Sequence, residues 1–126
     1  MDVAKIVAEN TQLEGIDINA SLFPKAHPSN VHFSTGSIVS LPEDWTGTFD
    51  LVHQRLLIGS LQSNEWEAAI SEIYRVLKPG GCAMLAEVGP EWPQEKGTTA
   101  YETLRKALEQ LQKSRGHISE IGRAHV

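Results

Sequence analysis

A run of nearly all-apolar residues, CAMLAEV at positions 82–88, places the strongest constraint on the fold. It follows a Lys-Pro-Gly-Gly stretch at 78–81, where the proline ends the preceding helix and the glycines permit a reversal of the chain. Continuous apolar runs of this length are typical of strands that helices cover on both faces, and such strands belong to parallel sheets. The run therefore predicts an α/β layer structure.

An amphipathic helix is predicted immediately before this turn. Its apolar residues recur at helical spacing and form one stripe: Trp66, Ile70, Ile73 and Leu77. Asn64 and Glu67 have the spacing of a capping box, so we expect the helix to begin at Asn64.

The rest of the chain alternates between strand-like and helix-like segments. The predicted segments are a short N-terminal helix carrying Val3, Ile6 and Val7, strands near 13–18, 31–38 and 49–53, and a last amphipathic helix near 101–111. This order is typical of a single α/β domain with a mostly parallel sheet. We expect that domain to occupy residues 1–126, with a weakly periodic tail at 116–126.

Composition excludes several classes of function. With 16 acidic and 11 basic residues the net charge is −5, which gives no indication of nucleic-acid binding. No apolar run approaches the ~20 residues of a membrane span, and the charged N-terminus is not a signal peptide. Cys82 has no second cysteine to pair with, and we expect it to be a buried, inert thiol. These features predict a protein of the cytoplasm, with the nucleus as an alternative, and they predict no metal site.

Three stretches in register carry a resemblance to a known family. GIDIN at 15–19 ends a strand in an acid, FDLVHQRLLIG follows at 49–59, and EIYRVLKPGG at 72–81 precedes the apolar strand. In this order they resemble class I S-adenosylmethionine-dependent methyltransferases, and more narrowly their fungal LaeA-like secondary-metabolism branch. The resemblance covers residues 1–115. It implies a partial Rossmann-like sheet, S-adenosylmethionine as cofactor and a small-molecule substrate.

The resemblance also implies which residues bind the cofactor. Asp17 matches the acid that accepts hydrogen bonds from the two ribose hydroxyls, although it could instead only cap the following turn. Ile18 follows it. Ser37 and Ile38 match the segment that lies against adenine, with simple core packing as the alternative for Ile38. Gln54, at the end of the 49–53 strand, completes the predicted cofactor set.

Two residues are predicted to be catalytic. His53 lies near the end of a strand that adjoins the transferred methyl group in the family, and a histidine there could act as a general base. The alternative is a structural histidine. Glu87 closes the next strand and could face the same site, or it could pair with a loop amide. The expected reaction is methyl transfer to O, N or C of a small secondary metabolite.

Parts of the family pattern have no counterpart in these 126 residues. They contain no G-x-G-x-G loop, and neither the family's first strand nor its last two strands can be recognised. We therefore expect this chain to correspond to the middle of such a domain. Without the first strand, the strands at 15–18 and 49–52 each have a backbone edge that lacks a hydrogen-bonded neighbour. We expect them to pair directly, or a homodimer or a different partner chain to complete the sheet.

Two functions from other classes remain open. One is a non-catalytic methyltransferase fold that acts as a partner or scaffold subunit. The other is a methyltransferase-like fold used for a different reaction on a small molecule.

Overall fold

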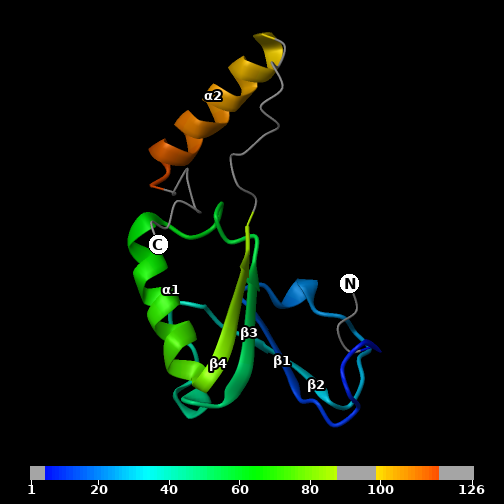
Figure 1. The fold of residues 1–126 in the computed structure, drawn as a ribbon. Coiled ribbons are helices and arrows are strands. Elements are labelled where there is room, and N and C mark those ends of the chain that lie inside the picture. The colour runs from blue at the N-terminus through cyan, green and yellow to red at the C-terminus, as the bar shows by residue number, and fades with distance from the viewer. Residues whose placement is uncertain (1–4, 88–98, 117–126) are drawn as a thin grey trace.

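A computed structural model describes residues 5–87 and 99–116. Strands and helices alternate along this part of the chain (Figure 1). In chain order the elements are β1 (Leu13–Asp17), the 3-10 helix η2 (Ala20–Leu22), β2 (Val31–Thr35), the 3-10 helix η3 (Glu43–Trp45), β3 (Phe49–Arg55), α1 (Ser63–Val76), β4 (Leu77–Ala86) and α2 (Thr99–Ser114). The predicted α/β class is confirmed, and each of the predicted strands is present.

The strands form two parallel pairs. β1 pairs with β2 in a register that joins Gly15 to Phe33 and Asp17 to Thr35. β3 pairs with β4, with His53 opposite Met84. Figure 1 shows α1 on one side of β3 and β4, with the β1–β2 pair on the other side. Because both pairs are parallel, the polar residues that follow β1 and β2 share one edge, as do those that follow β3 and β4.

Of the two arrangements predicted, direct pairing of the 15–18 and 49–52 strands is not the one present, and completion of the sheet by another chain stays a prediction. Among the described strands, β1 forms a ladder only with β2, and β3 only with β4. The connection after β2 runs to α1 instead: Leu41, Pro42 and Thr46 are hydrogen-bonded to Glu72 and Arg75 of the helix, as described below.

The core lies between α1 and the segments that approach it. Ala69, Ile73 and Val76 are buried along one face of the helix. Of the predicted stripe, Trp66 and Ile73 are buried, whereas Ile70 is 45% exposed and Leu77 is the first residue of β4. At the other end of that face, Trp66 joins a cluster completed by three further residues, Ile58, Leu61 and Ala69. Trp66 is therefore a packing residue, as expected.

The start of α1 differs from the prediction at Asn64. The helix begins at Ser63, and the N–H of Gln62 donates to Glu65 Oε2 at 2.8 Å. The capping spacing is thus that of Gln62 and Glu65, two residues earlier than predicted. Burial of Leu61 in the core fixes where the chain turns into the helix, and this tertiary constraint outweighs the stronger intrinsic capping preference of asparagine.

β4 is longer and less covered than predicted. It extends from Leu77 to Ala86, so it starts before the apolar run, and Val88 lies outside the described residues. Met84 is 54% exposed and Cys82 is exposed, so the expected buried thiol is wrong. Within the described residues α1 covers one face of the β3–β4 pair and no helix covers the other, which explains both findings.

The two ends of the described chain give a mixed result. Residues 5–10 form turns and a bend instead of the predicted helix, and Val3 lies outside the described residues. The predicted last helix is present as α2. The carbonyl of Gly116, just after it, accepts hydrogen bonds from both the N–H and the hydroxyl of Ser63, each at 2.8 Å. The end of α2 is thereby attached to the start of α1.

Candidate functional site

Asp17 ends an extended strand, as predicted. Its backbone carbonyl accepts the Gly36 N–H at 3.0 Å, which ties the end of β1 to the end of β2. Its side-chain Oδ1 accepts the Asn19 N–H at 2.8 Å, so the carboxylate does cap the turn that follows. Among the described residues Oδ2 accepts no hydrogen bond. One carboxylate oxygen therefore orients the side chain, and the other is available to a hydroxyl donor.

The turn after Asp17 is itself ordered by side chains. Asn19 Oδ1 accepts both the N–H of Ser21, at 3.0 Å, and its hydroxyl, at 2.7 Å, and so caps η2. Ile18, between the two capping residues, is 75% exposed. It contributes nothing to the core, which leaves its side chain accessible to a ligand at this edge.

Ser37 and Ile38 follow β2 and behave differently from each other. Ser37 Oγ accepts the Val39 N–H at 3.3 Å, and Ser37 forms an isolated antiparallel bridge with Ser40. Ile38 packs against the core cluster around Trp66. The core-packing alternative for Ile38 is thus what the structure contains, while Ser37 stays beside Asp17 at the carboxyl edge of the β1–β2 pair.

His53 and Gln54 are neighbours in β3 and therefore point to opposite faces of the sheet. His53 is exposed, on the face that also carries Leu51 and Met84. Gln54 is 5% exposed, and neither its Nε2 nor its Oε1 has a hydrogen-bond partner in the described part of the chain. The Trp66 indole N–H is likewise buried and unpaired. Buried polar groups are rarely left in this state, so the Gln54 amide is a candidate for contact with a ligand.

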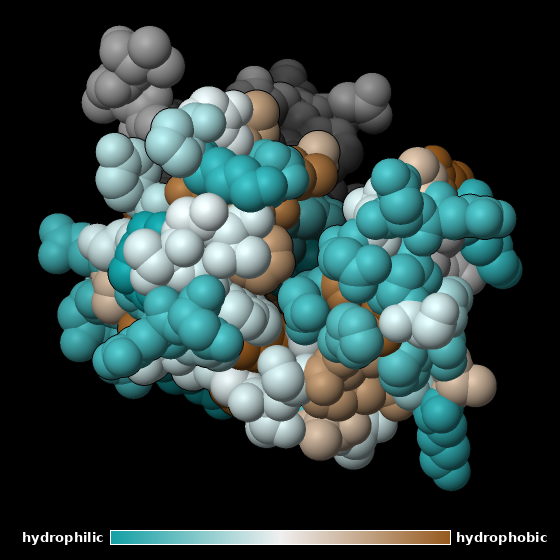
Figure 2. All heavy atoms as spheres, turned by 90° about the horizontal axis from the view of Figure 1, so that it is seen from below, coloured by the Kyte–Doolittle hydropathy of each residue, from teal (hydrophilic) through white to brown (hydrophobic). Residues whose placement is uncertain are grey.

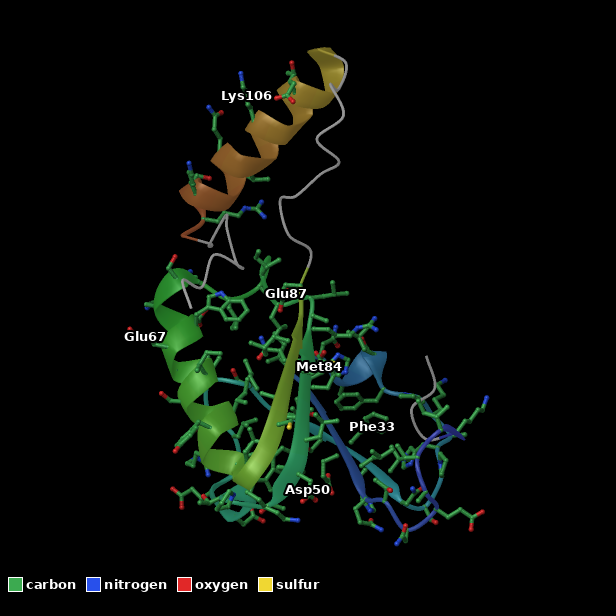
Figure 3. All side chains as sticks on the ribbon, in the orientation of Figure 1. Phe33, Asp50, Glu67, Met84, Glu87 and Lys106 are labelled. Atoms are coloured by element: carbon green, nitrogen blue, oxygen red, sulfur yellow. The ribbon has the colours of Figure 1, made fainter. Side chains whose placement is uncertain are left out.

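Glu87 lies just beyond the end of β4 (Figure 3). Its Oε1 accepts the Leu57 N–H and its Oε2 accepts the Ile58 N–H, both at 3.0 Å. The alternative left open by the sequence, pairing with a loop amide, is therefore the observed arrangement. Both oxygens are engaged with the loop that connects β3 to α1.

A charged network that the sequence reading missed lies at the other end of α1. Arg75 donates to Glu72, to the carbonyls of Leu41 and Pro42, and to the Thr46 hydroxyl. The Arg75 hydrogen bonds lower the pKa of the Glu72 carboxyl below its ordinary value; partial burial opposes this, and the Leu41 N–H adds to it. The signal in the sequence was the i, i+3 spacing of the two charges in EIYR.

An open hollow of about 550 Å³ surrounds this network, lined by Val39, Ser40, Leu41, Glu43, Thr46, Glu72 and Arg75. None of the predicted site residues lines it. Many of the polar groups that line this hollow are hydrogen-bonded to one another. The hollow is therefore part of the packing interface between α1 and the 39–46 segment.

The predicted site residues thus form two groups. Asp17, Ile18 and Ser37 lie together where β1 and β2 end. His53, Gln54 and Glu87 lie where β3 and β4 end. The 38–41 segment connects the groups, because Ile38 and Val39 pack against a cluster that contains Ile58. The structure describes no group of three or more potential metal ligands within 5–87 and 99–116.

Comparison with known protein families shows which family this chain belongs to. Residues 2–81 match the model of a methyltransferase domain family. The chain belongs to this methyltransferase family. Membership implies S-adenosylmethionine as the methyl donor, and Asp17, with an accepting oxygen at a parallel strand end, suits the ribose of such a ligand.

Among curated proteins, fungal methyltransferases are similar to this chain. Methyltransferase grgD of Penicillium sp is 31% identical over 109 residues, which are 82% of this chain and 38% of grgD. N-methyltransferase verN of Clonostachys rogersoniana is 34% identical over 90 residues, 69% of this chain and 31% of verN. The chain therefore spans about a third of the length of these relatives.

A solved structure has the same fold. The PH0226 protein from Pyrococcus horikoshii OT3 superposes with a TM-score of 0.58 at 25% identity, covering 83% of this chain and 45% of that protein. The methyltransferase chain is thus an α/β Rossmann-like structure with a partial sheet. None of its described helices is long and apolar enough to cross a membrane.

Proposed function

We propose that this chain carries the cofactor-binding part of a fungal S-adenosylmethionine-dependent methyltransferase of secondary metabolism, in the LaeA-like branch. The observation that carries the proposal is Asp17, an acid at the carboxyl end of a parallel strand, within the segment that the methyltransferase family model matches. Ligands of open α/β sheets bind at this edge. In this proposal Asp17 holds the ribose hydroxyls, Ser37 adjoins the adenine, and Gln54 contributes its unpaired amide.

The proposed acceptor atom is a nitrogen of a small molecule. The support is that several relatives are named N-methyltransferases, among them verN and gliN of Aspergillus fumigatus, the latter 32% identical over 81 residues. Methyl transfer from a sulfonium to a neutral amine forms the N–C bond, breaks the S–C bond and leaves a proton to be removed. His53 is exposed and lies near the end of β3, so it is the candidate base for that proton.

Isothermal titration of the chain with S-adenosylmethionine tests the proposal. We expect a dissociation constant below about 100 µM, within the range common for enzyme ligands. Binding in the millimolar range, or no detectable heat, would overturn the proposal for this chain. S-adenosylhomocysteine, the product of methyl loss, serves as a second probe, and it should compete with S-adenosylmethionine for one site.

A second candidate function is that of an assembly subunit. The specific observation is the unpaired backbone edge of β1 and of β3 among the described residues, next to exposed apolar side chains such as Leu51 and Met84. Figure 2 views the molecule from below and shows hydrophobic residues beside a furrow between two masses of atoms. Unprotected strand edges favour pairing with another chain, and the occupant we propose is a second copy of this chain.

Light scattering coupled to size-exclusion chromatography tests the assembly. A dimer mass across a tenfold dilution series is the expected result for the self-paired form. A monomer mass at every concentration would exclude it. The two candidate functions are separable because cofactor titration reports on the first and mass on the second.

A further inference from the structure

The turn between β3 and α1 contains a backbone conformation that its side chain disfavours. Leu56 has φ of 57°, and among the described residues no other non-glycine residue has a positive φ. A bulky residue in this left-handed region is strained and persists only where the surrounding structure holds it. Such outliers concentrate at functional sites. The groups that hold Leu56 in this conformation are therefore candidates for a functional role.

The holding groups come from the end of β4. The Leu56 N–H donates to the Ala86 carbonyl at 2.9 Å. The next two N–H groups, those of Leu57 and Ile58, donate to the two oxygens of Glu87 at 3.0 Å each. Three consecutive backbone donors are thus bound by two consecutive residues. A carboxylate that accepts backbone N–H groups makes stronger hydrogen bonds than a neutral acceptor does.

The consequences of this turn lie on both sides of it. After it, Ile58 enters the core cluster with Leu61. Before it lie His53 and Gln54, the last residues of β3 that the proposed function uses. A chain that left β3 in an extended conformation would carry Leu57 and Ile58 away from Glu87, and the end of β3 would lose its anchor to β4.

We propose that Glu87 is a positioning residue: its carboxylate grips the Leu57 and Ile58 amides, holds Leu56 in its left-handed turn and thereby fixes the end of β3 at the cofactor site. The role differs from general-base catalysis, because both carboxylate oxygens face backbone donors. The proposal that Glu87 holds this turn rests only on the hydrogen bonds described above. Its effect on ligand binding rests on the proposed function.

Two variants of equal charge change test the grip. Glu87→Gln replaces one accepting oxygen by an NH₂ group that cannot accept the facing N–H. Glu67→Gln is the matched control, because Glu67 is an exposed residue of α1 that points away from the sheet (Figure 3). We expect hydrogen exchange of the Leu57 and Ile58 amides to accelerate about tenfold in Glu87→Gln and to stay unchanged in Glu67→Gln. Equal exchange in both variants would overturn the grip.

A rescue variant separates positioning from simple support of the fold. Glycine adopts positive φ without strain, so Leu56→Gly in the Glu87→Gln background should slow the two amides again. It should also restore affinity for S-adenosylmethionine, which we expect Glu87→Gln to lower about tenfold. If the parent chain binds S-adenosylmethionine but Glu87→Gln binds it as tightly as Glu67→Gln does, the positioning role is wrong. If the parent chain itself does not bind, the proposed function fails, and the exchange data still decide the grip.

Discussion

Arg75 and Glu72 form a bidentate pair on α1, with Arg75 Nε 2.8 Å from Glu72 Oε1 and Arg75 Nη2 2.7 Å from Glu72 Oε2. The same carboxylate accepts the Leu41 N–H at 2.6 Å. One turn of helix therefore binds the backbone of the segment that leaves β2. This relationship ties the connection after β2 to α1, while β1 and β2 share no ladder with β3.

Removing the acceptor of the Leu41 N–H should loosen this connection. We expect Glu72→Ala to lower the free energy of unfolding by about 1–2 kcal/mol, because the N–H of the buried residue Leu41 loses its charged acceptor. Urea unfolding followed by circular dichroism measures it. Lys78→Ala is the control, since its ion pair with Asp50 is exposed. An equal effect of both substitutions would contradict the assignment.

The same carboxyl predicts how stability responds to acid. The pKa of Glu72 is below its ordinary value of 4.5 in the folded chain, chiefly because of the Arg75 hydrogen bonds. A depressed folded pKa contributes stability above the unfolded value, and that contribution is lost as pH falls through the folded pKa. We expect the urea midpoint to fall more steeply with acidification below pH 4.5 in the parent chain than in Glu72→Gln. Parallel pH profiles would contradict this.

Close packing at Gly15 gives a steric prediction. A Cβ built at Gly15 would lie 2.5 Å from Phe33 Cδ1, and the Phe33 ring is stacked on Phe23 with centroids 5.2 Å apart. Gly15→Ala must therefore displace an aromatic ring, and we expect a loss of about 1–3 kcal/mol in unfolding free energy. Gly59→Ala is the matched control, because nothing lies within 4 Å of its added Cβ. Thermal melts of both variants provide the comparison.

Two alanine substitutions test which residues cap the start of α1. Glu65→Ala removes the acceptor of the Gln62 N–H, and we expect it to cost about 1 kcal/mol. Asn64→Ala should change stability by less than about 0.5 kcal/mol, since the helix does not begin there. The reverse ranking would favour the cap predicted from sequence.

The proposed ribose contact predicts a loss of ligand affinity at Asp17. Asp17→Asn keeps an oxygen for the Asn19 N–H but removes the charge, so the turn should survive while hydroxyl binding weakens. We expect affinity for S-adenosylmethionine to fall by about 10- to 100-fold. Asp44→Asn, in η3, is the control for loss of one negative charge. If Asp17→Asn binds S-adenosylmethionine as well as the parent chain does, the assignment of Asp17 is wrong.

The sequence alone determined the local elements and their kinship. The apolar spacing of α1, the acid that closes β1 and the Lys-Pro-Gly-Gly stretch after the helix each depend on residues close together in the chain, and the pattern they form led to the methyltransferase family. Local patterns could not determine which strands pair. The 39–46 segment binds α1 through Arg75 and Glu72, contacts made across about thirty residues, and β1 forms no ladder with β3.

Only the tertiary structure decided what Glu87 and Ile38 do. In the sequence, a glutamate after a strand and an isoleucine after a turn are each compatible with ligand binding or with a purely structural role. The structure shows the contacts that each makes: two backbone donors face Glu87, and Ile38 packs against the core around Trp66, while their ligand roles stay predictions. Such contacts join segments distant in sequence, and their geometry exists only once the chain has folded.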